Sequence, residues 1–145
     1  MTAREYLTQL RTIDLRIKKM CEEAAALREM LTGGGISYDK DQVLSSPTNA
    51  QEIRLVRLLD LEEQISREVD AYLSKRALII QQISQLDDIR FVTILTYRYV
   101  PDERGRVKTL VQIAGVMDYE EAYVRRLHRK ALQAFSQKWI RKDTL

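Results

Sequence analysis

"IAGVMDYEEAYVRRLHRKAL", residues 113–132, begins with a small apolar run, passes through an acidic joint, and continues as a helical pattern with four basic side chains. The apolar residues of this pattern recur at steps of three and four, as on the buried face of an amphipathic helix. They are Val124, Leu127, Ala131, Leu132 and Phe135. The stretch therefore predicts a helix with one apolar face and a basic face exposed on its other side.

The preceding stretch "KTLVQIAGVM", residues 108–117, predicts a shorter helix with Leu110, Ile113 and Ala114 pointing inward. Small Ala114 suits a close crossing of two helices, and Asp118 tolerates the left-handed conformation of a tight turn. Short helix, turn and longer helix follow one another in the order of a helix-turn-helix domain. An ordinary pair of helices that packs an amphipathic face is the alternative interpretation.

Upstream of this pair, Asp87 can cap a helix that carries Ile89, Phe91, Val92, Leu95, Tyr99 and Val100. The stretch "PDERGR", residues 101–106, predicts a loop between this helix and the next.

The N-terminal half predicts two long helices. The first has apolar residues at alternating steps of three and four, namely Ala3, Tyr6, Leu10, Ile13, Ile17, Met20, Ala24, Leu27 and Leu31. Gly33 to Gly35 end it, and a flexible loop is expected at about residues 33–48. The second helix should start near Thr48 or Asn49, and its apolar seam comprises Leu55, Leu58, Ile65, Val69, Tyr72, Ile79, Ile83 and Leu86. Charged Glu62 and Arg76 stand where the repeat asks for apolar residues. Either these two side chains pair or extend toward solvent, or the seam is misplaced by one residue.

Two long helices joined by a loop predict an antiparallel helical hairpin over residues 1–85, followed by a helix-turn-helix domain over residues 86–145. Such a hairpin has a thin core, which either the C-terminal domain or a second copy of the chain would cover. We therefore expect residues 1–85 to mediate self-association as a homodimer.

Composition supports an all-α fold, since the 145 residues include 31% charged side chains but only 5 Gly and 2 Pro. The net charge of +3 is uneven, because residues 86–145 hold 12 Lys and Arg against 8 Asp and Glu, a balance of +4. This excess favours a polyanionic partner. A single cysteine, Cys21, and the lack of a signal or membrane-spanning run predict a cytoplasmic protein without a membrane partner.

The sequence favours a protein that is not an enzyme. His128 is the only histidine and lies beside the apolar stripe, which suits packing or a phosphate contact better than catalysis. No cofactor and no metal are expected, because one His and one Cys at helical positions do not form a zinc site unless carboxylates supply nearly all the ligands. Gly33 to Gly35 lack the Lys-Ser/Thr of a phosphate-binding loop.

The stretch "LTYRYV…TLVQIAGVMDYEEAYVRRLHRKALQAF" resembles region 4 of bacterial sigma factors, the helix-turn-helix that reads a promoter element. "MTAREYLTQLRTIDLRI", "VLSSPTN" and "DLEEQISREVDAYLSKRALIIQQISQLDDIRF" extend the resemblance to phage and prophage small transcriptional regulators of the ArpU and RinA type. The chain differs at Glu120, where the family commonly has Ser or Thr, and at Gln112, where sigma-like domains often have Glu. The resemblance implies a DNA-binding regulator, and a contact of the helix at residues 87–99 with RNA polymerase.

The resemblance also implies a set of residues at or near the DNA side of the second helix: Glu120, Glu121, Tyr123, Arg125, Arg126 and Arg129. Helical spacing agrees, because Tyr123, Arg126 and Lys130 share a face flanked by Arg125 and Arg129. Lys108, Thr109 and Gln112 suit phosphate contacts at the start of the preceding helix. We expect a sequence-specific regulator that binds double-stranded DNA. The alternatives are a helical protein that docks on RNA polymerase or another phage protein without reading DNA, and a basic face that is merely solvated.

Overall fold

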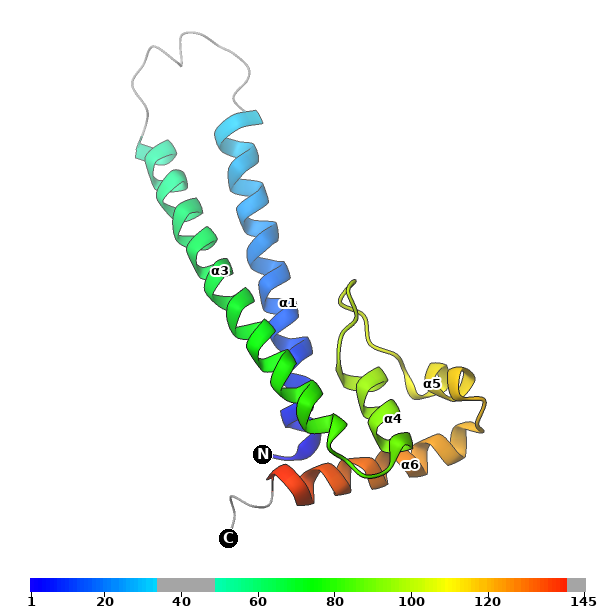
Figure 1. Ribbon diagram of the computed structural model, residues 1–145. Coiled ribbons are helices and arrows are strands. Elements are labelled where there is room, and N and C mark those ends of the chain that lie inside the picture. Colours follow the sequence, from blue (N-terminus) through cyan, green and yellow to red (C-terminus); the bar gives the residue numbers. More distant parts are fainter. Residues whose placement is uncertain (34–48, 141–145) are drawn as a thin grey trace. The chain divides into compact units, whose positions relative to one another are not determined.

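The computed structural model describes residues 1–33 and 49–140, and within these ranges the chain forms helices and no strands (Figure 1). The predicted all-α class is confirmed. The elements are α1 (Ala3–Arg28), the π-helical turn η1 (Glu29–Gly33), α3 (Asn49–Ser84), α4 (Ile89–Tyr99), α5 (Leu110–Met117), α6 (Glu121–Phe135) and the π-helical turn η3 (Ser136–Ile140). The loop expected at about residues 33–48 lies, apart from Gly33, outside the described residues. None of the helices described here has the length and apolarity needed to cross a membrane.

The chain divides into two compact units. Unit 1 comprises Met1–Asp14 and Tyr72–Leu145, and unit 2 comprises Leu15–Ala71. Helices α1 and α3 therefore each contribute one part to each unit. The boundary expected near residue 85 falls inside unit 1, because the N-terminal part of α1 and the C-terminal part of α3 pack with the later helices.

Unit 2 has a small core in which Ala24 of α1 packs with Leu58 and Leu61 of α3. The expected seam of α3 was wrong at Leu55, which is 48% exposed. At Glu62 two of the alternatives are confirmed: its exposed side chain pairs with Arg28, and the seam is displaced by one residue, since Leu61 is 1% exposed. A step of three from Leu58 to Leu61, and of four from there to Ile65, keeps apolar side chains on one face. Glu62 lies beside that face.

Ion pairs flank the small core of unit 2. Arg57 binds Glu23 at 2.9 Å, Arg16 binds Glu68 at 3.4 Å, and Arg28 binds Glu62 at 3.6 Å. Because all these side chains are substantially exposed to solvent, each pair contributes little, on the order of 0–1 kcal/mol. The apolar contacts of unit 2 thus supply most of its stability.

Unit 1 is built on two apolar clusters. The first joins the start of α1, the end of α3, α4 and α6. Its buried members are Ala3, Leu7, Leu10, Ile79, Ile83, Leu86, Leu95, Tyr99, Val100, Ala131 and Phe135. Gln82 links α3 to two other segments at the edge of this cluster. The side-chain oxygen of Gln82 accepts a hydrogen bond from Tyr6 Oη at 2.7 Å, and its backbone carbonyl accepts one from Trp139 Nε1 at 3.0 Å.

The second cluster of unit 1 lies between α4, α5 and α6. Its buried members are Ile94, Ile113, Ala114, Val124 and Leu127. The inward orientation expected for Ile113 and Ala114, and for the apolar stripe of α6, is confirmed. Each large aliphatic side chain buried in this way stabilises the fold by about 1.5–3 kcal/mol.

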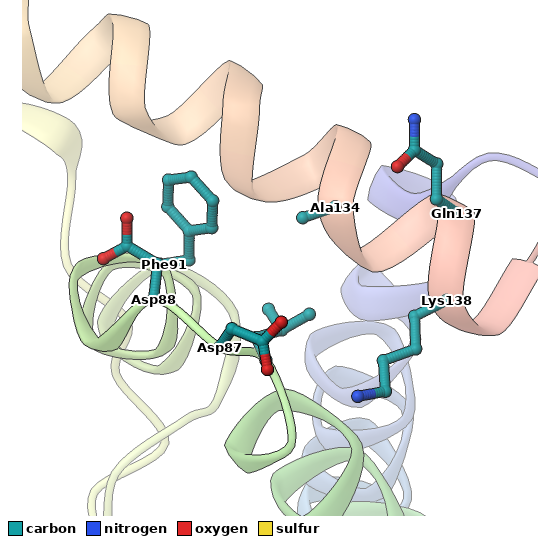
Figure 2. A pocket seen from close by; sticks show the side chains of 7 residues that line it. Asp87, Asp88, Phe91, Ala134, Gln137 and Lys138 are labelled. Atoms are coloured by element: carbon teal, nitrogen blue, oxygen red, sulfur yellow. The ribbon is translucent and has the colours of Figure 1, made fainter.

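The connection between α3 and α4 corrects the expected helix cap. Asp88, not Asp87, is the N-cap of α4, and its carboxylate accepts a hydrogen bond from the backbone N–H of Arg90 at 2.9 Å. Asp87 is exposed and lines a cavity of about 340 Å³ that also contacts Phe91 and Lys138 (Figure 2). Adjacent aspartates both satisfy the cap preference, so the backbone conformation at residue 88 decides between them.

His128 lies inside unit 1 and is 4% exposed. Its Nε2 is hydrogen-bonded to Tyr99 Oη at 2.8 Å, and the two rings are stacked with centroids 5.7 Å apart. Burial, followed by the charges of Arg4, Arg98 and Arg129, lowers the pKa of His128 from 6.5 to about 4. The packing role expected for this histidine is confirmed, and a phosphate contact is excluded by its burial.

We predict that His128 makes the stability of the protein fall as the pH is lowered from 6.5 toward 4. In this window the unfolded chain binds a proton that the folded protein does not, so acid favours unfolding by up to about 3 kcal/mol. Urea unfolding at several pH values should give a smaller change in the free energy of unfolding for His128→Gln than for the parent. Equal changes in the two proteins would contradict a neutral buried histidine.

Candidate nucleic-acid interface

Two of the predicted site residues cap the N-terminus of α5. Thr109 is the N-cap, its hydroxyl accepts a hydrogen bond from the backbone N–H of Gln112 at 3.1 Å, and the Gln112 side-chain oxygen accepts one from the backbone N–H of Thr109 at 2.9 Å. This reciprocal arrangement is a capping box, for which Gln serves as well as Glu. Both side chains are exposed at the helix start, but their oxygens already bind the backbone of α5.

Asp118 forms the joint between α5 and α6 in the left-handed conformation, with φ 59° and ψ 45°. The expectation for this residue is confirmed. The backbone N–H groups of Asp118 and Tyr119 both donate to the Ala114 carbonyl, the latter at 3.0 Å. These bonds close the end of α5 within one turn, and the chain then enters α6 only three residues later.

Helix α6 begins at Glu121, and Glu120 is its N-cap without a side-chain cap bond. Glu121 forms an ion pair with Arg125 one turn later, and Arg125 Nε donates to it at 3.1 Å. A carboxylate in the first turn also complements the partial positive charge of the helix N-terminus. Both predicted acidic residues are exposed, but Glu121 is directed along its own helix and offsets one of the four basic charges.

Tyr123 is half-buried and packs against the second apolar cluster. Its ring meets that of Tyr119 edge to face, with centroids 5.1 Å apart, and its Oη accepts a hydrogen bond from Arg90 Nη1. The Arg126 guanidinium lies 5.7 Å from the centre of the same ring. Tyr123 therefore stabilises the start of α6. Because its ring and hydroxyl make these contacts, less of its surface can contact a ligand than the helical spacing predicted.

Arg90 is the residue at this site that the sequence did not reveal. Asp88 holds its guanidinium through an ion pair at 2.7 Å, and hydrogen bonding to Arg90 lowers the pKa of the Asp88 carboxyl. The sequence offered only weak local evidence for the ion pair, namely the position of Asp88 two residues before Arg90 at a helix start. Nothing in the sequence indicates the contact with Tyr123, which lies 33 residues further along the chain.

The four basic side chains of α6 are all exposed, opposite the buried stripe. Arg125 pairs with Glu121 and Arg126 packs on Tyr123. Within residues 1–33 and 49–140, no carboxylate forms an ion pair with Arg129 or Lys130. Arginine guanidinium groups can bind guanine edges or phosphate oxygens through two parallel hydrogen bonds, and lysine binds phosphate as a point charge.

Lys108 precedes the cap of α5 and is partly buried. Its backbone N–H donates to the Tyr97 carbonyl at 2.9 Å, and its Nζ lies 5.4 Å from the centre of the Tyr97 ring. The predicted residues therefore form two groups, one at the start of α5 and one along α6. In the described part of the chain, no three His, Cys, Asp or Glu side chains gather as a metal-binding group.

The left-handed joint generates a stability prediction. A branched side chain at Asp118 would strain the turn, whereas glycine adopts this conformation without a steric penalty. We expect Asp118→Val to be less stable than Asp118→Gly by about 1–2 kcal/mol, with the parent between them. Urea unfolding followed by circular dichroism measures the difference, and equal stability of the two variants would contradict the role assigned to the joint.

Comparison of the chain with protein-family models, with curated proteins and with solved structures finds no match.

Proposed function

We propose that the protein is a sequence-specific DNA-binding transcriptional regulator of phage type, in which α5, the joint at Asp118 and α6 act as a sigma-region-4-like helix-turn-helix. Helix α6 would enter the major groove, while the start of α5 would approach the DNA backbone. The N-terminal parts of the chain would form an antiparallel helical hairpin. The order of the ion pairs supports this arrangement, because Arg16 pairs with Glu68 whereas the later Glu23 pairs with the earlier Arg57.

The observation that carries this proposal is the distribution of side chains around α6. Val124, Leu127, Ala131 and Phe135 are buried, so Arg125, Arg126, Arg129 and Lys130 must emerge on the opposite side. A helix that presents several cations directly after a tight left-handed joint matches the requirements of groove binding. Three of the four cations have no ion-pair partner in the described ranges, so their charge is available to neutralise phosphates.

A second candidate function is docking on RNA polymerase or another phage protein without reading DNA. Three exposed apolar side chains of unit 1 favour it, namely Ile89 of α4 at 72% and Val111 and Val116 of α5 at 57% and 54%. A pull-down with genomic DNA fragments, run in parallel with a column of immobilised host polymerase, separates the two functions. Retention by polymerase with no enrichment of DNA would favour docking.

We predict that the basic residues of α6 differ in their effects on DNA binding. Arg125 and Arg126, near the start of the helix, suit base edges, so replacing either by Ala should cost about 1–3 kcal/mol on the selected sequence and relax its preference. Arg129, a turn later, suits phosphate, so Arg129→Ala should weaken all sequences alike and lower the salt slope by about one. Fluorescence anisotropy with selected and scrambled duplexes at several salt concentrations measures both effects.

Arg67→Ala is the matched control for this experiment. Arg67 pairs with Glu63 one turn earlier on α3, as Arg125 pairs with Glu121 on α6, so it tests the loss of one paired surface charge elsewhere. Tyr123→Phe adds a test of the hydroxyl that binds Arg90, without loss of the ring. If all the α6 variants stay folded and bind both duplexes like the parent, α6 is not the recognition helix.

We further propose that the protein self-associates as a dimer through its N-terminal helices. The support comes from unit 2, where the first part of α3 exposes Ile53, Leu55, Val56 and Leu59, each by 48–66% of its surface. Four large apolar side chains within two turns form an exposed patch of the kind that marks protein contacts. A second copy of the chain would remove this apolar surface from water.

Sedimentation of the full chain at tens of micromolar should reveal a dimer, and Leu59→Glu should shift the equilibrium toward monomer. Val116→Glu is the control, because Val116 is exposed to a similar extent, 54% against 57%, but lies in unit 1. A parent protein that remains monomeric in this range would overturn the proposed assembly.

A further inference from the structure

A cavity of about 440 Å³ lies in unit 1, where the loop between α4 and α5 passes the end of α4 and a turn of α3. Its volume falls within the roughly 300–1,000 Å³ typical of small-molecule sites. The charged side chains that line it are Arg76, Asp102, Arg106 and Lys108, and Tyr97 and Gln112 lie beside them. The cavity therefore has three cationic groups and one carboxylate.

The single carboxylate of this cavity serves the loop itself. Asp102 Oδ1 accepts hydrogen bonds from the backbone N–H groups of Arg104 at 2.8 Å and Arg106 at 2.9 Å. These bonds, the one from Arg106 first, lower the pKa of Asp102, and the charges of Arg106 and Lys108 lower it further. Asp102 thus stays ionised while it shapes the loop, and the cavity keeps an excess of positive charge.

Two of the cations are held in place. Arg76 Nη2 donates to the Pro101 carbonyl at 3.3 Å, and the backbone N–H and ammonium group of Lys108 both contact Tyr97. The Arg106 guanidinium is exposed and has no ion-pair partner within the ranges that the structure describes. Gathering like charges beside one cavity costs free energy, which a bound anion would relieve.

The cavity beside Asp87 provides a contrast (Figure 2). Its charged groups are mainly used internally, because Asp88 binds Arg90 and Lys138 Nζ donates to the Gln85 carbonyl at 2.7 Å. The cavity beside Arg106 differs in having an excess of cations and a guanidinium that forms no ion pair with any residue in the described part of the chain.

We propose that the cavity lined by Arg76, Arg106 and Lys108 binds a phosphate group, with Arg106 and Lys108 as its main contacts. Arginine offers paired N–H donors to two phosphate oxygens, and the lysine ammonium adds a point charge. Two sources share this chemistry, a backbone phosphate of duplex DNA and a free phosphorylated compound. The first source rests on the proposed DNA-binding function, because the cavity adjoins Lys108 and Gln112 at the start of α5. The second source is independent of it.

The first arm of the test titrates the full ¹⁵N-labelled chain with inorganic phosphate at constant ionic strength and follows amide resonances. We expect saturable shifts centred on residues 101–112, and an affinity about tenfold lower in Arg106→Gln, as for the loss of a charged hydrogen bond. Arg104→Gln is the matched control, since it removes the same charge from the same loop but does not line the cavity. Lys108→Gln provides a second loss of charge if Arg106→Gln alters the loop.

The second arm measures duplex DNA binding by the same variants at several salt concentrations. If DNA supplies the phosphate, Arg106→Gln weakens selected and scrambled duplexes alike and lowers the salt slope by about one, whereas Arg104→Gln changes the slope less. The other outcome is that Arg106→Gln weakens phosphate binding but leaves DNA binding unchanged, or that the parent does not bind DNA at all. This outcome assigns the cavity to a free phosphorylated compound. If Arg106→Gln and Arg104→Gln behave alike in both arms, the phosphate site is overturned, whether or not the protein binds DNA.

Discussion

Burial of one stripe of α6 is the constraint on which the rest of unit 1 depends. Val124 and Leu127 complete the cluster between α4 and α5, while Ala131 and Phe135 complete the cluster that includes the ends of α1 and α3. One helix thereby ties both apolar clusters together, and its rotation about its own axis cannot change without opening one of them. The same constraint turns the basic side chains outward, so the core and the surface chemistry of α6 are two results of one packing arrangement.

Several polar residues at the candidate interface also stabilise the helices on which they lie. Thr109 and Gln112 cap α5, Tyr123 receives a hydrogen bond from Arg90, and Glu121 pairs with Arg125. These bonds fix the positions of the helix starts, which is the kind of preorganisation that a binding surface needs. They also reduce the number of side chains that are free to contact a partner. Among the cations of this surface, Arg126, Arg129 and Lys130 of α6 and Arg106 of the loop form no ion pair in the described ranges, so their charges remain available to an anion.

Local patterns in the sequence predicted the inward faces of α5 and α6 and the joint between them. The spacing of three and four placed the buried residues of α5 and α6, and the preference of Asp for positive φ identified the joint at Asp118. Where two neighbouring residues satisfied a local preference equally, the prediction failed, as with Asp87 and Asp88 at the start of α4. In the seam of α3 a strict repeat reached the charged Glu62, and only the packing decided that the neighbouring Leu61 is the buried residue.

The sequence by itself determined the helical class, the apolar faces of the helices and the position of the left-handed joint, because these depend on residues within a few turns of one another. Only the tertiary structure decided which distant side chains meet. It brought Arg90 to Tyr123 and Tyr99 to His128, and it gathered Arg76, Arg106 and Lys108 around one cavity. Helical periodicity specifies which face of each helix is buried, but it does not specify the neighbour against which that face packs. The contacts of Tyr99 with His128 and of Arg90 with Tyr123 therefore depend on the packing of α4 against α6. The same packing buries His128 and lowers its pKa, which keeps the imidazole neutral.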